Sequence, residues 1–121
     1  MKAYKLFRKM KDGTLRPLFI NKSQVIPIGE TLFAETHPTK GFKVRSGWHC
    51  CEIPRAPHLK LRPKNQPRRV WCEVEIWGYN HHKRPKSQGG MWFTARYMKV
   101  IRELDMIDVF RARLKLDESK K

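Results

Sequence analysis

Apolar and polar residues alternate with a period of two over several stretches of this chain, which predicts β-strands. The clearest stretch is 69–77, where four apolar residues alternate with two tryptophans and two glutamates. That pattern is typical of a half-buried strand. Stretches 3–9 and 91–102 are also β-like. Asp12-Gly13, placed between two apolar runs, predicts a β-hairpin at the start of the chain.

The hydrophobic period changes after residue 102. Leu104, Ile107, Phe110 and Leu114 recur at helical spacing over 103–118, so an amphipathic helix is predicted there, with this stripe facing the core. The expected fold class is therefore α+β: a small, mostly antiparallel β-sheet domain with long basic loops and a C-terminal amphipathic helix packed on the sheet. A chain of 121 residues fits one domain (1–121), with a basic β-rich body over 1–102 and the helix over 103–118.

The distribution of charge says more about the function of this chain than any motif does. The formal net charge is +16, and residues 1–102 hold 22 of the 27 basic residues but only six of the 11 acids. Segments 53–70 and 76–102 each contain six basic residues and no acid. Such fields attract polyanions. Pro-rich and Gly-rich loops in these segments are therefore predicted to contact phosphates through Arg55, Lys60, Arg62, Lys64, Arg68, Arg69, Lys83, Arg84 and Lys86.

Aromatic residues lie among these basic residues, as they do in proteins that stack bases. The sequence leaves open whether they stack on a ligand or fill the core: Trp71, Trp77, Trp92, Phe93 and Tyr97.

The segment 41–58 concentrates reactive side chains, with Trp48-His49-Cys50-Cys51 at its centre. No Cys-x-x-Cys spacing is present, so neither zinc nor another metal is expected to bind here. Adjacent residues on a strand point to opposite faces, which also disfavours a Cys/His nucleophilic pair. Burial of the cysteines is favoured. Glu73 and Glu75 share one face of their strand and form either a catalytic pair or ion pairs with a neighbouring strand.

Three cysteines, two of them adjacent, do not form a disulfide framework and are typical of a reducing compartment. No apolar run is long enough for a signal-peptide core or a membrane span. The expected location is therefore intracellular (cytoplasmic), with no membrane partner.

A partial family resemblance covers residues 1–102. The succession Tyr4–Arg8, Gly47–Cys51, Arg69–Val74 and Met98–Ile101 resembles small proteins with an ADP-ribosyltransferase-like split sheet. The resemblance implies NAD as the cofactor, with Arg8 or His49 as the cofactor-binding residue and Glu73 or Glu75 as the acid that orients the acceptor. In its overall sequence character the chain also resembles small proteins of bacteriophages and mobile elements.

Three functions follow as hypotheses. The favoured one is a non-enzymatic basic protein without a cofactor that contacts nucleic acid or a nucleoprotein complex through its loops. The second is an ADP-ribosyltransferase-like enzyme that uses NAD. The third is a phage-type inhibitor of a host system that binds an acidic protein surface.

Overall fold

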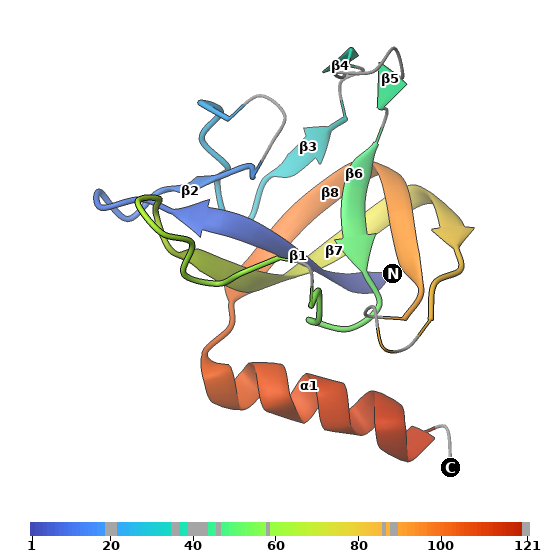
Figure 1. Cartoon of the computed structure of the whole chain (residues 1–121). Helices are drawn as coiled ribbons and strands as arrows, with labels where there is room; N and C mark the ends of the chain where they lie inside the picture. Colours follow the sequence, from blue (N-terminus) through green and yellow to red (C-terminus); the bar gives the residue numbers. More distant parts are fainter. Residues whose placement is uncertain are drawn as a thin grey trace.

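The computed structural model describes residues 1–18, 22–34, 37–38, 44–45, 47–57, 59–85, 87 and 90–119. It shows a small antiparallel β-sheet domain followed by one helix (Figure 1). The elements are β1 (Lys2–Lys9), β2 (Leu15–Arg16), β3 (Thr31–Phe33), β4 (His37–Pro38), β5 (Val44–Arg45), β6 (Trp48–Cys51), β7 (Arg69–His82), β8 (Trp92–Glu103) and α1 (Met106–Ser119).

Four strands close into a ring, which we call the barrel. β1 pairs with β7 and with β6, and β8 pairs with the same two strands, every pairing being antiparallel. The long strands β7 and β8 bend around the ring, as Figure 1 shows. β2 extends the sheet at the edge of β1, and β3 extends it at the edge of β8. Ring closure gives the sheet an inside, which is filled by apolar side chains.

The two faces of β1 are buried in different clusters. Ala3 and Phe7 point into the ring, where they pack with interior residues of β6, β7 and β8. Tyr4 and Leu6 point outward, where the segment after β6 and the helix cover them. Alternation along a strand explains this division, because successive side chains point to opposite faces. The burial of both faces places β1 at the centre of the fold.

The expected α+β class and antiparallel sheet are confirmed, and several predicted boundaries are wrong. β7 continues to His82, so residues 78–82 are strand and not loop. The helix begins at Met106, because Glu103 is still paired with Cys72 at the end of β8. Asp105 accepts a hydrogen bond from the amide of Asp108 (2.8 Å), which caps the helix start. No helix in the described residues is long and apolar enough to cross a membrane.

The predicted inward stripe of α1 is wrong. Leu104 of the predicted stripe is buried, but Ile107, Phe110 and Leu114 are all exposed. Among the helix side chains that the structure describes, Val109 is the fully buried one. Val109 and Ala112 pack against Tyr4, Leu6 and Trp71, which we call the outward cluster of β1 and β7. Helical spacing identifies an apolar face, but here a short connection from β8 sets which side of the helix meets the sheet.

Val109 and Ile107 provide a matched test of this orientation. Val109→Ala is expected to lower the free energy of unfolding by about 2 kcal/mol, because a buried branched side chain is removed. Ile107→Ala removes a similar side chain that is 61% exposed, and it is expected to change stability by less than about 0.5 kcal/mol. Urea unfolding of both variants measures the difference. Equal losses would contradict the burial of Val109, and a larger loss for Ile107→Ala would mean that the helix packs with its other face.

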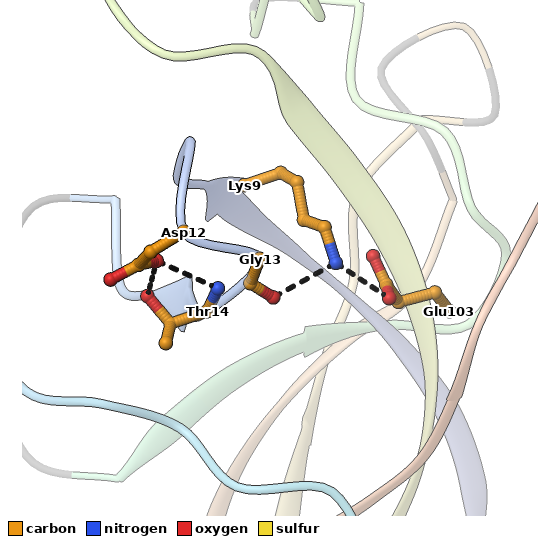
Figure 2. A network of polar contacts seen from close by, with 5 residues as sticks. All are labelled: Lys9, Asp12, Gly13, Thr14 and Glu103. Atoms are coloured by element: carbon orange, nitrogen blue, oxygen red, sulfur yellow. Dashed lines mark hydrogen bonds and ion pairs between the residues drawn. The ribbon is translucent and has the colours of Figure 1, made fainter.

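The hairpin between β1 and β2 is tied to the end of β8 (Figure 2). Lys9 Nζ donates to Gly13 O (3.0 Å) and lies 2.9 Å from Glu103 Oε2. Asp12 Oδ1 accepts hydrogen bonds from the amide (2.9 Å) and the hydroxyl (2.6 Å) of Thr14. These bonds lower the pKa of Asp12. The predicted Asp-Gly turn is confirmed, with Gly13 at a φ of 88° that favours glycine.

Candidate nucleic-acid interface

The segment between β6 and β7 carries most of the predicted phosphate contacts. Residues 52–57 and 59–68 are neither helix nor strand in the structure. Its apolar residues Ala56, Leu59 and Leu61 pack on the outward cluster of β1 and β7, so the segment is held against the barrel. Its cations are exposed: Arg55, Lys60, Arg62, Lys64 and Arg68. We call residues 53–68, which contain no acid, the basic segment.

Four acids of the described residues are paired with cations from outside the basic segment. Glu73 lies near Lys2 Nζ (3.8 Å) and Arg102 Nη2 (3.6 Å), while Asp108 pairs with Arg102 Nη1 (3.0 Å). Glu103 pairs with Lys9. Among the described ion pairs, none involves an exposed cation of the basic segment. These side chains therefore keep their charge available for an anionic partner.

An open pocket of about 320 Å³ lies between the basic segment and α1. Its apolar lining includes Leu59, Leu61 and Trp71, and among the described residues Arg55 and Arg113 are the charged ones that line it. Arg113 Nε donates to Pro54 O (2.9 Å), which fixes that side chain at the pocket. Burial, and then the nearby charge of Arg55, lowers the pKa of Arg113. Two like charges at one opening favour binding of an anion.

The other four residues predicted to contact phosphate differ in their exposure and in their hydrogen bonds. Arg69 is half-buried at the start of β7, and its Nη1 donates to Lys60 O (3.2 Å), so it supports the basic segment. Arg84 is also half-buried, donating to Gly90 O (3.1 Å) and to Cys51 Sγ (3.7 Å). Lys83 is exposed beyond the end of β7. Lys86 lies outside the described residues.

The five aromatic residues whose role the sequence left undecided differ in burial. Trp71 and Phe93 are buried and belong to the two core clusters. Trp92 is half-buried and stacks on His82, with ring centroids 4.3 Å apart. Trp77 and Tyr97 are exposed. Only these last two present large aromatic surfaces to a ligand.

The catalytic candidates occupy structural positions. Arg8 donates from Nε to Pro17 O (2.9 Å) and from Nη2 to Lys22 O. Glu73 is in the ion pairs given above, and Glu75 Oε1 lies 3.0 Å from the amino group of Met1. Glu73 is paired with Tyr4 of β1, and Arg8 lies four residues farther along that strand, about 13 Å away. Glu73 and Glu75 thus make the kind of charge pairs that the sequence offered as their alternative role.

His49 and the cysteines surround a lysine that points into the barrel. Lys5 is half-buried, and its Nζ donates to the carbonyl oxygen of His49 (2.8 Å). Burial lowers the pKa of Lys5. Cys50 is buried in the barrel interior, as expected, and Cys51 is half-buried in the outward cluster. The His49 ring packs against Trp92 at 5.2 Å between centroids. Within the described residues, no three His, Cys, Asp or Glu side chains are grouped as metal ligands.

Searches against protein-family models, curated proteins and solved structures found no match to this chain.

The sequence did not identify two residues that the structure places at exposed candidate positions, Arg113 and Phe33. Arg113 lies in the neutral C-terminal part of the chain, and only the packing of α1 brings it to Arg55. Phe33 lies in a three-residue strand and is exposed beside Tyr97. Neither residue has a local sequence signal, because each acquires its neighbours through long-range pairing.

Proposed function

We propose that this protein binds nucleic acid through the basic segment, together with Arg113. One observation carries the proposal: five exposed cations follow one another over an acid-free segment and take part in none of the described ion pairs. Phosphate groups are the anions that a row of such side chains fits best, because each phosphate can be met by one cation.

The packing of the segment supports this function. Leu59 and Leu61 anchor the backbone on the barrel, so the neighbouring cations are displayed on a supported loop. Lys60 and Arg62 alternate with these two anchors and are exposed. A supported loop loses less conformational freedom on binding than a free tail does, which favours affinity.

The proposal predicts a steep salt dependence that the basic segment controls. In a double variant Arg62→Ala/Lys64→Ala, the slope of log affinity against log salt is expected to fall by about 0.7 to 0.9 for each lost phosphate contact. Affinity at low salt should fall by a similar factor on every sequence tested, since phosphate contacts carry no sequence information. Fluorescence anisotropy with labelled DNA and RNA, titrated over salt, measures both quantities.

The double variant Lys22→Ala/Arg111→Ala is the matched control. It removes the same two charges from exposed positions outside the basic segment. We expect it to keep most of the affinity and the wild-type slope. If both double variants lose affinity equally, the attraction comes from net charge and not from this surface. If the wild-type protein binds no nucleic acid, the proposal is wrong, and titrations with NAD and with acidic proteins test the other two hypotheses.

A further inference from the structure

The outer face of the barrel carries a row of three aromatic side chains that the basic segment does not explain. Tyr97 of β8 is paired with Phe33 of β3 on one side and with Trp77 of β7 on the other. Their exposed fractions are 39%, 60% and 41%. We call this set the aromatic row.

Register places the three rings on one face. The next paired positions are Leu32, Met98 and Ile76, whose side chains pack in the barrel interior. Because side chains alternate along a strand, the aromatic row points outward from all three strands. Neighbouring strands are about 4.8 Å apart, so the three positions span roughly 10 Å. The rings of Phe33 and Tyr97 are in edge contact, with centroids 5.4 Å apart.

Two cations lie close to Tyr97 along β8. Arg96 precedes Tyr97, is exposed, and takes part in none of the described ion pairs. Lys99 lies two residues beyond Tyr97 on the same strand. The acid that is paired with Lys99 across the strands is Glu75, which the amino group of Met1 already neutralises in part. Exposed aromatic rings with free positive charge beside them match a partner that has flat rings and negative charge.

We propose that the aromatic row is a stacking platform for the bases of a single-stranded nucleic acid. The inference rests on the proposed function, in which the basic segment supplies phosphate contacts. Stacking on exposed rings tolerates any sequence, because every base has a π-face. A duplex hides its base faces inside the helix. The row therefore adds affinity for single strands only.

β7 connects the aromatic row to the basic segment. Trp71 and Trp77 lie on the same outward face of this strand, six residues or about 20 Å apart. The basic segment and α1 cover the Trp71 end and leave the Trp77 end open. A single strand that reaches both regions spans roughly six nucleotides at about 3.4 Å each. That length falls within the usual site size of about 4 to 16 nucleotides for small single-strand-binding domains.

The test compares a single-stranded 12-mer of mixed sequence with a duplex of the same length, for the wild-type protein and for Tyr97→Ala, Tyr97→Leu and Phe110→Ala. Both Tyr97 variants are expected to lower the single-strand affinity about 5- to 150-fold, with no change in duplex affinity and no change in the salt slope. Tyr97→Leu keeps an apolar side chain at this position, so its loss reports the ring. Phe110 is an exposed aromatic residue on α1, outside the row. Its ring lies 5.9 Å from the Arg113 guanidinium, so Phe110→Ala is expected to show no loss that is specific to the single strand.

The outcomes separate this inference from the proposed function. Unchanged single-strand affinity in folded Tyr97 variants, together with a loss in Arg62→Ala/Lys64→Ala, overturns the stacking platform and leaves the basic segment as the binding surface. An equal loss in Phe110→Ala also overturns the placement of the platform on the aromatic row. Absence of any nucleic-acid binding by the wild-type protein overturns both.

Discussion

Phe7→Ala is expected to lower the free energy of unfolding by about 4 kcal/mol, one of the two largest effects expected here. Phe7 has no exposed surface and lies in the interior of the barrel. Truncation to alanine removes its burial energy and leaves a cavity that the closed ring of strands cannot fill by collapse. Chemical denaturation at neutral pH measures the loss. A loss of this size consumes much of the stability of an ordinary domain.

Phe33→Ala is the control for this prediction, because the same residue type is 60% exposed there. We expect a loss below about 1 kcal/mol, mostly from the edge contact with Tyr97. If the two variants lose similar stability, the division between the barrel interior and the aromatic row is wrong.

The second large effect is a loss of stability at alkaline pH. Burial raises the pKa of Cys50 and of Cys72 from 9.0 to about 12. A thiol in the unfolded chain ionises near pH 9, whereas these two stay protonated in the folded protein. The folded state therefore binds more protons between about pH 9 and pH 12, and its stability falls over that range. A pKa difference of this size corresponds to a loss on the order of 4 kcal/mol for each thiol.

The variant Cys50→Ala/Cys72→Ala isolates the contribution of the thiols. It removes both groups that ionise only on unfolding, so its stability should fall less than that of the wild-type protein between pH 9 and pH 12. Lys5 acts in the opposite direction in both proteins, because its lowered pKa makes the folded state release a proton earlier as the pH rises. Denaturation curves at several alkaline pH values give the comparison. Parallel pH profiles for the two proteins would show that these thiols are not buried as described.

The distribution of charge indicates two uses for the cations of this chain. Lys9, Arg102 and Lys5 stabilise the fold, since each contacts an acid or a carbonyl group in the described structure. The exposed cations of the basic segment take part in none of the ion pairs of the described residues. Substituting them should thus change binding with little effect on stability. This separation makes the binding proposal testable without unfolding the protein.

Much of the β-structure could be predicted from the chain alone. Alternation over 69–77 identified the central strand and its buried residues Cys72, Val74 and Ile76, because a half-buried strand imposes that period directly. The Asp-Gly turn after β1 and the return strand over 91–102 were also local signals. The extension of β7 to His82 was missed, since glycine at 78 and polar residues after it are typical of a loop.

The candidate site was predictable only in part. Composition and position identified the cations of the basic segment, because an acid-free stretch with several prolines favours an exposed loop. Sequence could not sort the aromatic residues, since a tryptophan alternating with glutamate has the same pattern whether buried like Trp71 or exposed like Trp77. Coverage by α1 and the basic segment makes the difference between those two positions.

The sequence by itself determined the strand periodicity, the single helix at the end and the excess of positive charge, all of which depend on residues close together in the chain. The tertiary structure decided three further properties: closure of the ring, the face of α1 that is buried, and the alignment of Phe33, Tyr97 and Trp77. The physical reason is the same for each. These properties depend on which distant segments pair or pack, and each of those contacts satisfies local preferences that other arrangements would satisfy equally well.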